Sequence, residues 1–173
     1  RWVSTLGGFA SLCIAGVAMG LWLWSRRTAP VLAAAPALSL LLGALASFLA
    51  KAVFGRERPP VDLHAVTVGL AAFPSGHATG AAALFLAAAM TLALTVARPT
   101  ATKLLLAVGG AALAGLIGLS RLVLAVHWIS DVVAGWALGT AVATTVVMVS
   151  WFASTACRAR TWLRRPGRHR RRT

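Results

Sequence analysis

Residues 104–152 form an almost unbroken apolar run, in which charged residues and histidine occur only in the stretch SRLVLAVHWISD at positions 120–131. A single helix over this run would be about 74 Å long, at about 1.5 Å per residue. Since the hydrocarbon core of a bilayer is only about 30 Å thick, one span cannot hold it. We therefore expect two membrane spans, with the polar stretch at the turn between them.

Three more apolar blocks precede this run. They cover residues 2–24, 30–54 and 77–97, and each is long enough to cross a bilayer as a helix. Hydrophobic residues make up 59% of the 173-residue chain, well above the share in soluble domains. The sequence therefore predicts an all-α fold, a polytopic membrane helical bundle in which five spans are visible.

The basic residues indicate how the bundle is oriented. The chain has 17 basic and 3 acidic residues, and eight of the basic ones follow Cys157. A basic tail beyond a span usually lies in the cytoplasm, where anionic lipid headgroups attract it. We expect a transmembrane domain over residues 1–157 and a basic cytoplasmic tail over residues 158–173, in a multi-pass protein of the plasma membrane. A tail that binds RNA or another partner is the less favoured alternative, and we expect no nucleic-acid partner.

Counting the spans backwards from the tail assigns each loop to one side of the membrane. The basic loops at residues 26–27 and 98–103 fall on the cytoplasmic side with the tail. The connection at residues 55–73 and the turn near His127 share the extracytoplasmic side. The same count places residue 1 on the extracytoplasmic side, so we expect a further span upstream and six spans in the complete protein.

Small residues recur at helix-packing intervals, as Ala114 with Gly118 and Gly135 with Gly139. Such pairs allow helices to approach closely. Packing within the bundle is the favoured interpretation and a dimer interface the alternative, so the oligomeric state stays open.

His127 and Asp131 are the first candidates for chemistry, because a charged pair inside an apolar run is expensive in a membrane. At a spacing of four they would share one face of a helix, where a carboxylate can hydrogen-bond an imidazole. Such a bond fixes the tautomer and leaves the other ring nitrogen as a directed nucleophile or base. A polar pair that only packs helices together is the alternative.

The sequence PSGH at residues 74–77 predicts a helix start. Ser75 suits an N-cap, and Gly76 permits close backbone approach. The free amides and positive dipole end of that helix would form an anion site, with His77 beside it as a proton donor. Ordinary helix capping would explain the same four residues without any function.

Three cations, Lys51, Arg58 and Arg121, flank these candidates. Converging near a helix N-terminus, they would favour a multiply charged anion, and guanidinium groups match phosphate best. Each cation alone could simply extend to the membrane interface. A metal-dependent phosphatase needs several carboxylates, but the 3 acidic residues are scattered, so we expect no metal and no cofactor.

Together these residues resemble a known signature. Lys51-x6-Arg58-Pro59, Pro74-Ser75-Gly76-His77 and Ser120-Arg121-x5-His127-x3-Asp131 are similar to the three-part motif of the type 2 phosphatidic acid phosphatase (PAP2) superfamily. Every specified position matches, over residues 51–131. Six-span members of that family carry three spans before the lysine, whereas only two are visible here.

The resemblance implies a role for each residue. His127 would attack phosphorus and form a phosphohistidine, Asp131 would orient His127, and His77 would protonate the leaving oxygen. The phosphate oxygens would be held by Lys51, Arg58, Ser75, Gly76 and Arg121. The expected activity is metal-independent hydrolysis of a phosphate or diphosphate monoester on a membrane lipid.

The resemblance leaves the lipid open among phosphatidic acid, phosphatidylglycerol phosphate, polyprenyl diphosphate and a polyprenyl-linked sugar phosphate. The short linker at residues 60–72 slightly favours a polyprenyl (di)phosphate or a related cell-envelope lipid. Vanadium haloperoxidases and soluble acid phosphatases share the motif, but the membrane spans argue against both. The alternative from another class is a non-catalytic lipid-phosphate binding or transport protein, which would have no need of a nucleophile.

Overall fold

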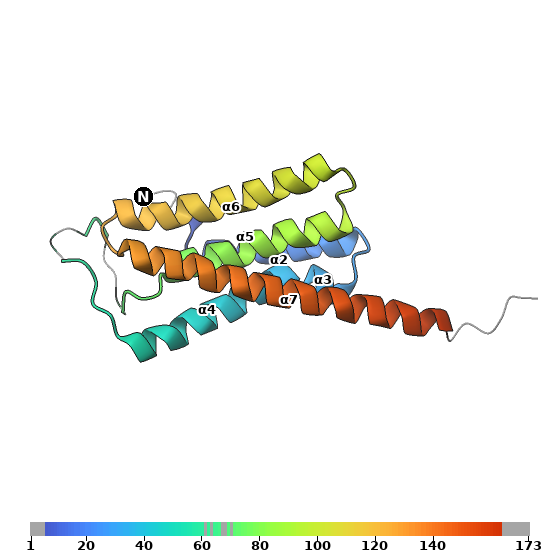
Figure 1. The fold of residues 1–173 in the computed structure, drawn as a ribbon, viewed down its shortest axis with the longest axis horizontal. Coiled ribbons are helices and arrows are strands. Elements are labelled where there is room, and N and C mark those ends of the chain that lie inside the picture. The colour runs from blue at the N-terminus through green and yellow to red at the C-terminus, as the bar shows by residue number, and fades with distance from the viewer. Residues whose placement is uncertain (1–5, 61, 63, 67–68, 70, 164–173) are drawn as a thin grey trace, which may run out of the picture.

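The computed structural model is an all-helical bundle (Figure 1) and describes residues 6–60, 62, 64–66, 69 and 71–163. Its main helices follow the apolar blocks of the sequence. They are α2 (Phe9–Ser25), α3 (Pro30–Ala33), α4 (Ala35–Phe54), α5 (Gly76–Thr95), α6 (Thr100–Val123) and α7 (Ile129–Leu163).

The predicted spans are confirmed as helices. Four helices, α4 to α7, are long and apolar enough to cross a membrane, and α2 is a shorter apolar helix of 17 residues. Residues 2–5, the start of the first predicted span, lie outside the described residues. The run at residues 104–152 does divide into two helices, and the turn between them lies between Val123 and Ile129.

The second predicted span is not one continuous helix. It divides at Ala34 into the single-turn α3 and the longer α4. Pro36 lies in the first turn of α4 and has no N–H to donate to the carbonyl of Leu32, so an unbroken helix would lack one bond there. The proline therefore favours a new helix start at this point.

Helix α5 is the centre of the bundle and contacts α4, α6 and α7. Alanine dominates its buried faces, and short side chains let the neighbouring helices approach closely. The fully buried alanines include Ala78, Ala81, Ala82, Ala83 and Ala87.

Gly135 and Gly139 bring α7 against α5. A Cβ on Gly135 would lie 2.8 Å from the carbonyl oxygen of Ser75, and one on Gly139 would overlap the carbonyl oxygen of Thr79. These small residues therefore pack inside the bundle, as predicted. Gly118 of α6 does the same against Trp136 of α7, whose indole would lie 2.5 Å from an added Cβ.

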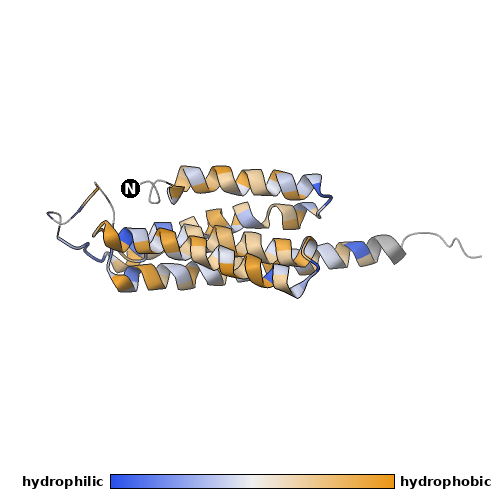
Figure 2. Cartoon of the chain, turned by 90° about the horizontal axis from the view of Figure 1, so that it is seen from above, coloured by the Kyte–Doolittle hydropathy of each residue, from blue (hydrophilic) through white to orange (hydrophobic). Residues whose placement is uncertain are grey.

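Hydrophilic residues gather at the two ends of the bundle, and the sides between them are largely apolar (Figure 2). Large side chains such as Leu41, Leu45 and Leu49 of α4 are exposed. This distribution suits helices whose sides contact lipid chains.

The helix directions bring four helix ends together at one end of the bundle. The C-terminal ends of α4 and α6 lie there with the N-terminal ends of α5 and α7 (Figure 1). Helix α7 then runs to the opposite end and continues to Leu163, so the first residues of the predicted basic tail are helical. Residues 164–173 lie outside the described part of the chain.

Candidate active site

The three predicted clusters meet at the end of the bundle where α4 and α6 end and α5 and α7 begin. His127 lies in a bend, because α6 ends at Val123 and α7 begins at Ile129. The prediction that His127 and Asp131 share a helix is therefore wrong. The two side chains still meet, since Asp131 lies in the first turn of α7 and points back toward the bend.

A capping contact orients the Asp131 carboxylate, which is fully buried. Its Oδ2 accepts a hydrogen bond of 2.9 Å from the backbone N–H of Trp128, three residues earlier. An acidic residue at the third position of a helix commonly reaches back to the cap in this way. The same oxygen lies 3.4 Å from Nδ1 of His127, but among the described residues this nitrogen makes no hydrogen bond.

The other ring nitrogen of His127 faces Arg58. Nη1 of Arg58 lies 3.3 Å from His127 Nε2 and donates to the carbonyl of Val126 at 2.6 Å. Nη2 of Arg58 donates to the carbonyl of Gly69 at 3.0 Å. Burial lowers the pKa of Arg58, and the negative charge of Asp131 partly opposes that shift. The imidazole is thus held between a carboxylate and a guanidinium.

His127 is a neutral base in this environment. Its pKa is lowered to about 3, first by burial and then, in order of size, by the nearby positive charges of Arg58, Lys51, Arg121 and His77. The same four groups therefore lie close enough to act on the imidazole through their charge. A neutral ring keeps a lone pair available for attack.

Ser75 connects the PSGH cluster to the His127–Asp131 cluster. It is the N-cap residue of α5, and its backbone N–H donates to the carbonyl of Asp131 at 2.9 Å. Its side chain makes no capping bond, unlike a typical serine cap. Among the described residues, the buried Ser75 Oγ has no hydrogen-bond partner. A buried hydroxyl of this kind suits a ligand oxygen.

Lys51 and Arg121 complete the cationic surroundings from two other helices. Lys51 lies in the last turn of α4, and its Nζ donates to the carbonyl oxygens of Ala71 and Ala72 at 2.5 and 3.3 Å. Arg121 lies in the last turn of α6 and is buried. Within the described part of the chain, no three His, Cys, Asp or Glu side chains gather as a metal site would require.

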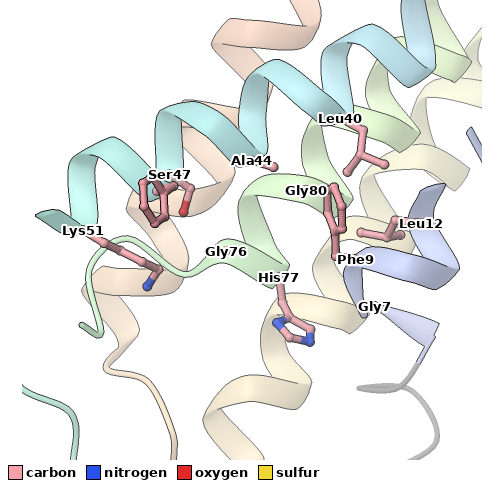
Figure 3. Close-up of a pocket in the computed structure, with 11 residues that line it drawn as sticks. Gly7, Phe9, Leu12, Leu40, Ala44, Ser47, Lys51, Gly76, His77 and Gly80 are labelled. Carbon is pink, nitrogen blue, oxygen red and sulfur yellow. The ribbon is translucent and has the colours of Figure 1, made fainter. Parts of the chain in front are cut away.

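A cavity of about 230 Å³ opens beside these residues, between α2, α4 and α5. Figure 3 shows Lys51 and His77 at the site end of this cavity, while Leu12 and Leu40 line its deeper part. Phe9 and Phe48 contribute further apolar surface. The cavity thus joins a charged end to an apolar interior.

Sequence reasoning missed three residues of this region. Arg56 donates to Asp131, Trp128 provides the N–H that binds the same carboxylate, and Ser47 lines the cavity with a buried hydroxyl. A second arginine two positions before Arg58 was the available signal for Arg56. Ser47 and Trp128 looked like ordinary helix and interface residues.

The chain was compared with known protein families, solved structures and curated sequences. The profile of the PAP2 superfamily matches residues 32–155. Among solved structures, the chain is similar to a transmembrane PAP2 type phosphatidylglycerolphosphate phosphatase from Bacillus subtilis. The TM-score is 0.76 and the identity 26%, over 83% of this chain and 71% of the other. Curated protein sequences gave no significant match.

Proposed function

This chain belongs to the PAP2 superfamily, and from that premise we propose that it hydrolyses a lipid phosphate or diphosphate monoester through a phosphohistidine on His127, without a metal ion. The family and the structural neighbour support a membrane phosphatase acting on a lipid phosphate. The observation that carries the histidine mechanism is the neutral imidazole of His127 between Asp131 and Arg58.

In the first step, Nε2 of His127 attacks phosphorus and the bond to the lipid oxygen breaks. Protonated His77 gives its proton to that oxygen, so the lipid alcohol leaves uncharged. The imidazole gains positive charge as the phosphorus–nitrogen bond forms, and the buried carboxylate of Asp131 stabilises this charge. Asp131 Oδ2 lies on the Nδ1 side of the ring, which leaves Nε2 to react.

In the second step, water attacks the phosphorus of the phosphohistidine. His77, now neutral, accepts a proton from the water, and the phosphorus–nitrogen bond breaks. Inorganic phosphate leaves, His127 returns to the neutral form and His77 to the protonated form. The cycle needs no group beyond the two histidines, Asp131 and the phosphate-binding residues.

The phosphate oxygens are held by cations and by the start of α5. Lys51, Arg58 and Arg121 supply the positive charge. The N-terminal turn of α5 at Gly76 adds its dipole, and Ser75 Oγ adds a donor that has no partner among the described residues. Arg58 moves its Nη1 from Nε2 of His127 to a phosphate oxygen, which frees the lone pair for attack.

The alternative function is non-catalytic binding or transport of a lipid phosphate on the same scaffold. The cations and the helix start would serve that function equally well. An oriented His127 and a second histidine at position 77 favour the enzyme, because binding alone requires neither. Release of inorganic phosphate distinguishes the two functions.

The cavity beside Lys51 and His77 supports a lipid as the substrate. Its lining is mostly apolar, it lies between α2 and α4, and its polar groups are at the site end. A lipid could place its phosphate among the cations and the first part of its chain along Leu12 and Leu40. Both a polyprenyl diphosphate and a glycerolipid phosphate have this division between charged head and apolar chain.

We expect the variant Ala44→Phe to impair turnover of long-chain lipids selectively, because Ala44 lines this cavity. Displacing about two methylene groups, at about 0.8 kcal/mol each, would lower kcat/KM by about tenfold. A water-soluble aryl phosphate, which has no chain to displace, should be hydrolysed at the wild-type rate. Phosphate release in detergent with EDTA present, from phosphatidylglycerol phosphate and from a polyprenyl diphosphate, measures the effect.

The matched control is Ala52→Phe, on the exposed side of the same helix. It should leave both substrate classes unaffected. Equal losses for the lipid and the soluble ester in Ala44→Phe would contradict chain binding in this cavity. Wild-type protein that releases no phosphate from any member of the panel would favour the binding protein.

We also propose that the site faces away from the cytoplasm, in a plasma-membrane protein with one transmembrane domain over residues 1–157 and a cytoplasmic tail over residues 158–173. The end of the bundle opposite the site carries Arg26, Arg27 and Arg98 in its loops. Excess basic charge in short loops favours the cytoplasmic side. Arg158 on α7 would then lie near anionic headgroups.

Cysteine labelling in intact cells tests this orientation, once Cys13 and Cys157 have been replaced. Asp62→Cys, in the exposed loop at the site end, should react with an impermeant thiol reagent. Thr100→Cys, exposed at the opposite end, should react only after the membrane is opened. The reverse pattern would place the site in the cytoplasm.

A further inference from the structure

Arg56 makes a contact with the site that the proposed mechanism does not use. It lies in the loop that follows α4, two residues before Arg58. Its Nη1 lies 3.0 Å from Oδ1 of Asp131 and donates to Oγ of Ser130 at 2.7 Å. The guanidinium is partly exposed, with 41% of the side chain accessible, whereas the Asp131 side chain is fully buried. Arg56 therefore binds the carboxylate from the solvent side.

The two oxygens of Asp131 have different partners. Oδ1 accepts from Arg56, while Oδ2 accepts from the Trp128 N–H and faces Nδ1 of His127. A carboxylate held at both oxygens cannot rotate about its last bond without breaking a charge-assisted hydrogen bond. The Arg56 contact thus keeps Oδ2 directed at the imidazole.

Trp128 connects the same two segments a second time. Its indole Nε1 donates to the carbonyl of Glu57 at 3.2 Å, and the Arg56 guanidinium lies 5.9 Å from the centroid of a Trp128 ring. The loop after α4 and the start of α7 are therefore joined by contacts at Trp128, Ser130 and Asp131. These contacts hold Arg56 in place for its bond to the carboxylate.

We propose that Arg56 is a positioning residue that acts through Asp131 and not on the phosphate, an inference that rests on the proposed function. Nη1 of Arg56 is occupied by Asp131 and Ser130, whereas Arg58 is the arginine whose donors face His127 Nε2. Loss of Arg56 would leave the carboxylate free to turn away from Nδ1. It would then orient and stabilise the imidazole less well during phosphoryl transfer.

A double-mutant cycle on the detergent-solubilised protein tests this role, with radiolabelled phosphatidic acid as the substrate so that low rates can be measured. We expect Arg56→Gln to lower kcat by about 10- to 100-fold, the loss typical when a partner that orients a functional ligand is removed. KM should stay within about threefold of wild type, because the phosphate contacts remain. In the Asp131→Asn background, Arg56→Gln should change kcat by less than about threefold, since residues that act as a unit are not additive.

Three further variants separate positioning from a general structural role. Arg56→Lys keeps the charge and one donor to Asp131, so it should recover part of the lost kcat. Ser130→Ala removes the second acceptor of Nη1 but leaves the carboxylate contact, so kcat should remain within about threefold of wild type. Arg98→Gln makes the same chemical change in an exposed loop at the opposite end and should match wild type.

The outcomes that overturn the inference are distinct from failure of the proposed function. Three results would overturn the positioning role alone. They are full kcat in Arg56→Gln, a raised KM with unchanged kcat in the same variant, and additive losses of kcat in the Asp131→Asn background. Wild-type protein without turnover would overturn the proposed function, and the role of Arg56 with it. If Arg56→Gln fails to fold, Arg56→Lys takes its place in the double-mutant cycle. Its effect on kcat is then compared between the wild-type and the Asp131→Asn backgrounds.

Discussion

Replacing His127 with alanine should abolish turnover, with a loss of at least about 10⁴-fold in kcat. Alanine provides no lone pair to attack phosphorus, and removal of a nucleophile that works with partner residues has cost about 10⁶-fold in a well-studied protease. His127 lies in the bend between α6 and α7 and not in a helix interface, so the fold should remain. Phosphate release by purified protein and a thermal unfolding curve measure the two effects separately.

His64→Ala is the matched control for that change. His64 also lies in a loop at the site end, where its ring hydrogen-bonds the carbonyl of Pro59 at 2.8 Å. It has no role in the proposed mechanism, so its loss should leave kcat within about threefold of wild type. Substantial turnover in folded His127→Ala protein would contradict the assignment of the nucleophile.

Asp131→Asn should lower kcat by about 10²- to 10⁴-fold. Asparagine has one acceptor oxygen in place of two, so it can accept from Arg56 or from the Trp128 N–H but not from both, and it does not stabilise a positive imidazole. It can also select the wrong tautomer of His127, the change that costs about 10⁴-fold in the serine protease triad. KM for the lipid should change far less, because the proposed phosphate-binding residues are Lys51, Arg58 and Arg121. Steady-state kinetics on one lipid substrate separate kcat from KM.

The matched control is Asp62→Asn, the same substitution in the exposed loop at the site end. It should behave as wild type. If Asp131→Asn kept full kcat, Asp131 would serve only to cap α7 and to pack against α5. A large rise in KM at constant kcat would instead place the carboxylate among the groups that bind the substrate.

Much of the fold could be predicted from the sequence, because a bilayer of fixed thickness limits how a long apolar run can fold. The division of residues 104–152 into two helices follows from that length alone. The division of the second span at Ala34 was missed, since hydropathy does not register the missing N–H of Pro36. Helix α7 also extends beyond the apolar run to Leu163. This last part contains basic residues, so hydropathy alone does not predict that it is helical.

The convergence of the three clusters at one end of the bundle could be predicted, but their local geometry could not. The spacing of four placed His127 and Asp131 on one helix, whereas the chain bends at His127 and the carboxylate reaches back across the start of α7. Arg56 was missed because its partner is 75 positions away in the sequence. Contacts of this kind depend on how loops meet at the end of the bundle, and no local pattern indicates them.

Trapping of the covalent intermediate tests the central claim most directly. Wild-type protein would react for milliseconds with ³²P-labelled phosphatidic acid in detergent with EDTA, and the reaction would be stopped in alkali, where phosphohistidine is stable. We predict protein-bound label on the peptide that contains His127, in the same amount with and without EDTA, and no label in His127→Ala. Label on any other residue, or turnover that stops in EDTA and returns with magnesium, would contradict a metal-free phosphohistidine mechanism at this site.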